Sequence, residues 1–94
     1  MTSIHTLHIL NKAPEHPRTA ECMNAIRSGD ALLLTENAVL ALSILDDQAP
    51  MAQVYAIASD AIARGFGQSG TKATLVDYPA MVKLTAQAQH LISW

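Results

Sequence analysis

The sequence has few of the residues that would support a disulfide scaffold or a nucleic-acid-binding surface. Its 94 residues include one cysteine, Cys22, so an internal disulfide is impossible, and a lone thiol suits a reducing compartment. Six Lys and Arg against eight Asp and Glu give a net charge of −2, without the basic stripe that phosphate binding requires. These absences predict a cytoplasmic protein that does not bind nucleic acid directly.

Long hydrophobic runs are also absent. No apolar stretch approaches the roughly 18 to 20 residues that a spanning helix needs. The opening MTSIHTLHIL lacks both the basic region and the apolar region of a signal peptide. We therefore expect neither a membrane span nor an export signal.

The composition is that of a folded domain with apolar surface to spare. Half of the residues are hydrophobic, only 15% are charged and the mean hydropathy is +0.18, values far from those of disordered chains. The length fits one domain, residues 1–94, with a single core. Since a chain this small leaves much of its surface in water, we expect some apolar residues to pack against another protein.

Short apolar runs alternate with helix signals along the chain. The runs that predict buried parallel strands are residues 3–10, 31–35, 53–57 and 74–76, with a short edge strand at 91–94. The first predicted helix begins at Pro17 or Thr19, runs through Ile26 and is closed by Gly29. The second covers residues 38–45, and the third covers residues 61–64, with Ser59 or Asp60 as its cap and Gly65 at its end. The last is capped by Asp77 and has Pro79 in its first turn. Polar residues 46–50 predict a turn. This alternation predicts an α/β fold: a small three-layer α/β/α, Rossmann-like domain with a parallel sheet of four to five strands.

Two motifs resemble binding or catalytic signatures, but their context argues against those functions. Residues 65–70 spell G-x-G-x-x-G, yet a dinucleotide fingerprint follows a first strand and opens a helix, whereas this segment follows a helix and leads into a strand. It is better interpreted as a helix end and a loop.

Asp46 and Asp47 are adjacent in a predicted turn and are more simply solvated than paired as general acid and base. No cofactor is predicted.

The four histidines predict no metal site. His5 and His8 are three apart on a predicted strand, where side chains alternate, so we expect them to face opposite sides of the sheet. His16 and His90 lie in distant segments, and no ligand cluster has the spacing of a zinc site. Hydrogen-bonded or exposed histidines are the simpler interpretation.

Cys22 is the one residue with a distinctive reaction, because a thiolate can attack a persulfide sulfur and carry it onward. Near the start of a helix, the helix dipole and Arg18 would favour the thiolate. Alternatively, Cys22 shares the apolar face of Ala25 and Ile26 and is an inert buried cysteine. Both interpretations stay open at this point.

Read as a whole, the chain resembles the DsrH/TusB family of sulfur-relay subunits, within the wider DsrE-like group. The segments that carry the resemblance, in order and spacing, are residues 5–7, 11–14, 29–34, 54–57, 60, 62–65, 77–78 and 82–85, with Trp94 at the end. The resemblance covers nearly the whole chain. It implies a DsrE-like fold and a complex with DsrE/TusD-like and DsrF/TusC-like subunits, usually a dimer of heterotrimers.

In the tRNA branch of this family, the resemblance implies relay of persulfide sulfur between an upstream and a downstream carrier, ending in 2-thiouridine at the tRNA wobble position. The main acceptor cysteine there belongs to the TusD-like partner, so this chain would be an accessory subunit of a sulfurtransferase complex. In the branch linked to dissimilatory sulfur oxidation, DsrH-like chains carry a cysteine in the first helix, where Cys22 falls, which makes Cys22 a candidate persulfide carrier. A homo-oligomeric module that binds a small ligand is the third alternative.

One turn departs from the family pattern. Relatives commonly have glycine after an acidic residue at the end of the second strand, where this chain has Glu36 and Asn37. Asparagine is the next best residue for a left-handed backbone, so we expect it to retain the turn.

Overall fold

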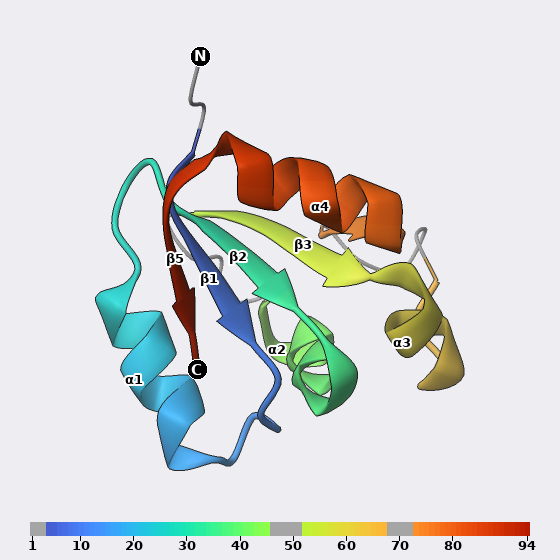
Figure 1. The fold of residues 1–94 in the computed structure, drawn as a ribbon. Coiled ribbons are helices and arrows are strands. Elements are labelled where there is room, and N and C mark those ends of the chain that lie inside the picture. Colours follow the sequence, from blue (N-terminus) through green and yellow to red (C-terminus); the bar gives the residue numbers. More distant parts are fainter. Residues whose placement is uncertain (1–3, 46–51, 68–72) are drawn as a thin grey trace.

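The computed structural model describes residues 4–45, 52–67 and 73–94, which form one parallel sheet with helices on both faces (Figure 1). The strands are β1 Ile4–Leu10, β2 Ala31–Leu34, β3 Gln53–Ile57, β4 Thr74–Val76 and β5 Ala88–Ser93. The helices are α1 Pro17–Ala25, the 3₁₀ helix η1 Glu36–Ala41, α2 Leu42–Leu45, α3 Ala58–Ala63 and α4 Tyr78–Gln87. The predicted α/β fold with a parallel sheet is confirmed.

The order of the strands across the sheet is β4-β3-β2-β1-β5, and every pair is parallel. From β1 to β4 each strand is added beside the previous one, and the chain then crosses back so that β5 lies on the other side of β1. The central strand β2 is buried at all four positions, which explains why its sequence is a continuous apolar run without alternation.

Two apolar cores lie on the two faces of the sheet. On one face, α4 packs through Leu84 and Met81 against the inward side chains of the strands, such as Leu7 and Leu33. On the other face, α1, η1, α2 and α3 pack against Leu10, Leu32, Leu34 and Ala56. Figure 1 shows the same division, with α4 above the sheet and the other helices below it. The three-layer prediction is confirmed.

Two helix starts follow the rules expected from the sequence. Asp77 caps α4, since its Oδ1 accepts a hydrogen bond from the N–H of Ala80 at 2.9 Å, and a proline occupies the first turn. Helix α1 begins at Pro17, and the cap is His16, whose Nδ1 accepts from the N–H of Arg18 at 3.1 Å.

Other helix boundaries differ from the predictions. Gly29 does not close α1, which ends at Ala25; Gly29 instead takes a positive φ of 91° in the turn that leads into β2. Neither Ser59 nor Asp60 caps α3, because the helix begins at Ala58, immediately after β3, and both residues lie inside its first turn. Gly65, with φ of 86°, does follow the end of α3, as predicted.

The segment predicted as one helix over residues 38–45 is a 3₁₀ helix followed by one turn of α-helix. The residue with the left-handed backbone is Glu36, the first residue of η1, with φ of 51°, and not Asn37. The N–H of Glu36 donates to Oδ2 of Asp60 at 2.8 Å, which helps hold this unfavourable backbone in place. The predicted turn at residues 46–50 lies outside the described residues.

The last strand is longer than the sequence suggested. In place of a short strand at residues 91–94, β5 begins at Ala88, directly after α4, and pairs with β1 from Ile4↔Ala88 to Ile9↔Ser93. Trp94 continues this pairing, since its N–H donates to the carbonyl of Ile9 at 2.9 Å. The local sequence did not predict a strand at residues 88–90, because Ala and Gln have a low strand propensity and favour a helix. Pairing with β1 imposes the strand instead.

Candidate functional site

Cys22 lies inside the core between α1 and the sheet. Its side chain is fully buried and packs in the same cluster as Leu10, Ile26 and Leu34. Burial raises the pKa of the thiol to about 12, because the thiolate would lose its hydration. The expected thiolate-favouring effect of the helix start and of Arg18 is therefore absent, and the alternative of a buried cysteine describes the geometry. Its proposed role as a sulfur carrier stays a prediction.

A polar network joins β1 to the turn before β2 and to the residue that follows β5. His8 of β1 is almost fully buried, and its Nε2 lies 2.9 Å from Oδ2 of Asp30, the residue that precedes β2. Its Nδ1 accepts a hydrogen bond of 3.2 Å from the indole Nε1–H of Trp94, and the two rings are stacked with centroids 6.1 Å apart. Because an indole can only donate, His8 carries its proton on Nε2 and donates to the carboxylate.

Asp30 is the buried charge of this network. Its Oδ2 also accepts from the N–H of Arg27 at 2.9 Å. Burial by itself raises the pKa of this carboxyl, but the hydrogen bonds from His8 and from the Arg27 backbone, with a smaller electrostatic contribution from the nearby His8 and His5 rings, lower it by more. The pKa of Asp30 therefore lies below its ordinary value, and the carboxylate is ionised at neutral pH.

His5 and His8 both contact Asp30, which the prediction from strand alternation did not include. Nδ1 of His5 lies 3.5 Å from Oδ1 of Asp30, while His8 contacts Oδ2 of the same carboxylate. His5 is the first residue after the start of β1, and its N–H donates to the carbonyl of Gly29, so the strand begins beside the turn that carries Asp30. Strand alternation alone does not predict a contact made by a neighbouring turn.

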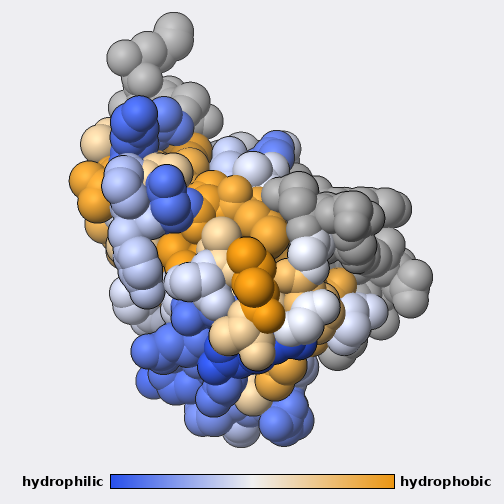
Figure 2. Space-filling model, turned by 90° about the vertical axis from the view of Figure 1, so that its right-hand side faces the viewer, coloured by the Kyte–Doolittle hydropathy of each residue, from blue (hydrophilic) through white to orange (hydrophobic). Residues whose placement is uncertain are grey.

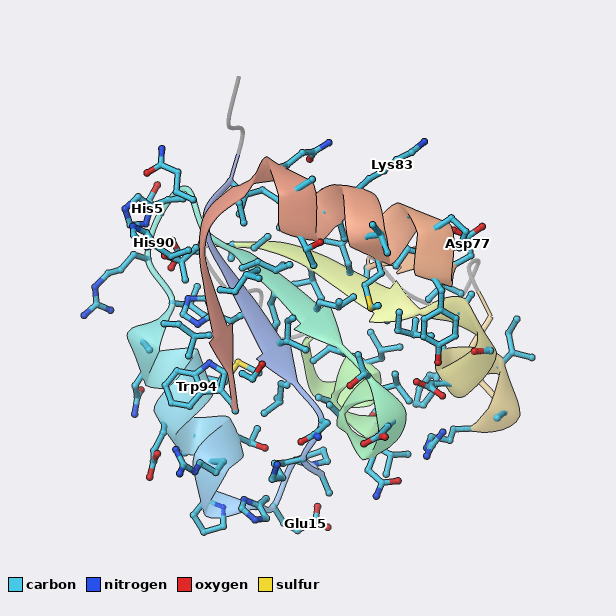
Figure 3. All side chains as sticks on the ribbon, viewed as in Figure 1. His5, Glu15, Asp77, Lys83, His90 and Trp94 are labelled. Atoms are coloured by element: carbon cyan, nitrogen blue, oxygen red, sulfur yellow. The ribbon has the colours of Figure 1, made fainter. Side chains whose placement is uncertain are left out.

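His90 also comes close to His5, although the sequence separates them widely. The ring centroids lie 5.4 Å apart at an interplanar angle of 58°, and Figure 3 shows the two side chains next to each other at one end of β1 and β5. His16 stays apart, as the cap of α1. Within residues 4–45, 52–67 and 73–94, no group of three or more His, Cys, Asp or Glu side chains is arranged to hold a metal ion.

A cavity of about 350 Å³ opens at the N-terminal ends of the strands. Its walls come from the first residues of β1, β2 and β3, together with Gly29, Asp30 and Gln87. At the C-terminal ends of β1 and β5, a lysine joins the two segments that follow the strands. Nζ of Lys12 donates to the Trp94 carbonyl at 3.0 Å and to Oδ1 of Asn11 at 2.6 Å. Parallel α/β sheets commonly bind ligands at that end, beside the strand where the chain reverses its direction across the sheet.

The two other motifs lie wholly or partly outside the described residues. Gly65 and Gly67 follow α3 in a non-helical segment, and the rest of G-x-G-x-x-G, residues 68–70, lies outside the described residues. Asp46 and Asp47 also lie outside them. Across the described part of the chain, no helix is long and apolar enough to cross a membrane.

The sequence did not identify Asp30 or Trp94 as site residues. One pattern could have identified the pair of His8 and Asp30. Each lies in or beside an otherwise apolar strand, and buried polar side chains in such positions need hydrogen-bond partners.

Comparison with known proteins places these features in context. Residues 12–91 match the family described as DsrH like protein. The chain is 34% identical to Protein TusB of Escherichia coli (strain K12) and 35% identical to Protein TusB of Enterobacter sp. (strain 638), in each case over 94% of this chain and 99% of the relative. The relative from Pectobacterium carotovorum subsp. carotovorum (strain PC1), also Protein TusB, is 30% identical over the same shares.

A solved structure has the same fold. The solution structure of protein Tm0979 from Thermotoga maritima superposes with a TM-score of 0.69 at 26% sequence identity, covering 86% of this chain and 91% of that one. The arrangement of strands and helices described above is therefore shared with a protein of experimentally determined structure.

Proposed function

The chain belongs to the DsrH family, as its sequence suggested, and on that premise we propose that it is a subunit of a heteromeric sulfur-relay complex in the cytoplasm. The complex would pass persulfide sulfur toward 2-thiolation of the tRNA wobble uridine. The observation that carries this proposal is the 30–35% identity, over nearly the full length of both chains, to relatives named Protein TusB.

We propose DsrE/TusD-like and DsrF/TusC-like subunits as partners, in a heterohexamer, with further sulfur-carrier proteins upstream and downstream. Exposed apolar side chains support a role in assembly: Ile62 of α3 is 65% exposed and Val82 of α4 is 60% exposed. Figure 2 views the side of the molecule on which α3 and the start of α4 lie and shows apolar side chains gathered near its centre. Leu91 and Ile92 of β5 are exposed as well. Apolar surface of this kind is typical of subunits that pack against other chains.

The buried thiol supports an accessory role in which a partner holds the acceptor cysteine. A sulfur carrier must present a thiolate to its donor, and Cys22 has neither exposure nor a lowered pKa. The sulfur-oxidation branch, with Cys22 as the persulfide carrier, is the second candidate, and it requires that binding of a partner opens the α1 side of the core.

A deletion strain tests the tRNA proposal directly. Loss of the gene should remove 2-thiouridine from the wobble position, measured by mass spectrometry of digested tRNA, and the wild-type gene should restore it. Restoration by Cys22→Ala as well would support the accessory role, whereas failure of a stable Cys22→Ala protein to restore it would support sulfur transfer through Cys22. Normal 2-thiouridine in the deletion strain would overturn the proposal.

Native mass spectrometry of the tagged chain, purified from its own cells, tests the partners. A three-component hexamer is expected. A homodimer or monomer alone would contradict the complex and favour the ligand-binding alternative.

A further inference from the structure

Two exposed histidine rings converge where β1 and β5 begin, outside every contact used above for the sulfur-relay proposal. The register pairs Thr6 with His90, so His5 and His90 lie on neighbouring strands, offset by one residue, and their rings are in contact. The His5 side chain is 61% exposed, and His90 is also exposed. Neither imidazole belongs to the two apolar cores, and Figure 3 shows both side chains at the surface beside each other.

The distance between the rings suits joint coordination of one metal ion. Zinc binds imidazole nitrogen at about 2.0–2.1 Å, and tetrahedral coordination then places two imidazole centroids roughly 5 Å apart. The observed centroid separation is 5.4 Å, with the rings tilted by 58°. Stacked or edge-to-face packing would not require such exposed rings.

A carboxylate, that of Asp30, lies close to His5, as is common for histidines that bind metals. Nδ1 of His5 lies 2.9 Å from Oγ1 of Thr6 and 3.5 Å from Oδ1 of Asp30. That Oδ1 atom is buried and accepts no hydrogen bond from the described residues. A histidine that binds a metal through one nitrogen typically donates the N–H of the other to a carboxylate, which orients the ring and increases its basicity.

We propose that His5 and His90 together bind a divalent transition-metal ion such as Zn²⁺, with the hydrogen bond between Nδ1 of His5 and Thr6 orienting the His5 ring, the Asp30 carboxylate beside it, and water filling the remaining coordination positions. Nε2 of His5 is the ligand atom on that side, because Nδ1 faces Thr6 and Asp30. Imidazole ligands select Zn²⁺, Cu²⁺ and Ni²⁺ over Mg²⁺ and Ca²⁺, which prefer oxygen. With two ligands from the chain, the site is an exchangeable one and not a closed structural centre.

The test is a titration of the full-length chain with ZnCl₂, followed by calorimetry and by the imidazole ¹H–¹⁵N signals of the four histidines. One Zn²⁺ should bind per chain and shift the signals of His5 and His90. Loss of a group that only supports a ligand already weakens metal binding by about 10–100-fold, so His5→Ala and His90→Ala should each weaken it by at least about tenfold. Both residues are exposed, and circular dichroism will verify that the variants fold.

His16→Asn is the matched control, since it removes the third surface imidazole while leaving a good helix cap. Its zinc affinity should equal that of the wild type. The proposal is overturned if the wild type binds no zinc, if His90→Ala binds as tightly as the wild type, or if His16→Asn alone loses binding. The readout needs no partner subunit and no tRNA, so failure here is distinct from failure of the sulfur-relay proposal.

Discussion

His8 and Asp30 form a buried hydrogen-bonded pair, with 2.9 Å between Nε2 and Oδ2. The pair joins β1 to the turn before β2, and the indole of Trp94 extends the connection to the end of β5. The Asp30 carboxylate is therefore linked, directly to His8 and through His8 to Trp94, with β1 and with the end of β5.

Replacement of Asp30 by alanine should be strongly destabilising. It would leave the Nε2–H of His8 without its acceptor and remove an acceptor from the Arg27 N–H, and an unsatisfied buried group costs about 1–3 kcal/mol. We expect a loss of about 2–3 kcal/mol in the free energy of unfolding, measured by urea denaturation. Asp77→Ala, which removes an exposed helix cap, is the control and should cost about 1 kcal/mol. Equal losses in the two variants would contradict the assigned role of Asp30.

Acid should weaken the fold partly through the same carboxylate. The pKa of Asp30 is lowered in the folded state, so its contribution is fully present above the unfolded value, about 3.9, and is lost as the pH falls through the folded value. The measurement is the melting temperature between about pH 6 and pH 2. Asp30→Asn should be less stable than the wild type at pH 6 and show a shallower acid decline, whereas Asp77→Asn should keep the wild-type slope.

The thiol of Cys22 should be unreactive in the native protein. With a pKa of about 12, only roughly one molecule in 10⁵ carries the thiolate at pH 7. Ellman's reagent should modify Cys22 at once in urea and only through unfolding in native buffer. Modification of the folded chain at the rate of the unfolded one would instead indicate an accessible thiol and favour the sulfur-carrier role.

The same thiol predicts an alkaline loss of stability. Since the folded pKa of Cys22 is raised, its contribution is present below the ordinary thiol value of about 8.5 and is lost as the pH rises toward the folded value. Cys22→Ala should flatten the decline of the melting temperature in that alkaline range. An unchanged alkaline slope in this variant would assign the decline to other groups.

Glu36→Gly should stabilise the protein. Glu36 holds a positive φ of 51°, a backbone region that costs a non-glycine residue about 1–2 kcal/mol, and its hydrogen bond to Asp60 uses only the main chain. After the entropy that glycine loses on folding, we expect a gain of about 0.5–1 kcal/mol in urea denaturation. Asn37→Gly is the control at the neighbouring position of the 3₁₀ helix and should give no gain.

Local patterns in the sequence predicted much of the fold. The apolar runs located β2, β3 and β4, and Asp77 with Pro79 marked the start of α4, because these signals lie within a few residues of the element they specify. The length of β5 was underestimated, since its strand conformation comes from pairing with β1 and not from its own residues. Glu36 takes the left-handed turn because Asp60, in another element, accepts its N–H.

The candidate sites were harder to predict for the same reason. His5 and His90 meet only because the last strand pairs with the first, and the partnership of His8 with Asp30 requires β2 to lie beside β1. Cys22 illustrates the opposite case: its place in the first helix was predicted correctly, but whether it faces the core depends on the packing of that helix on the sheet.

The pairing of β1 with β5 also affects how the chain folds during synthesis. β1 is synthesised before the other described strands, yet one of its two edges is completed only when residues 88–93 have been made. Until then the backbone groups along that edge lack their final partners, Nδ1 of His8 waits for the indole of Trp94, and contacts of such long sequence separation form slowly. A nascent chain of this protein therefore exposes one edge of β1 until β5 has been made, a period in which a chaperone or a partner subunit can bind it.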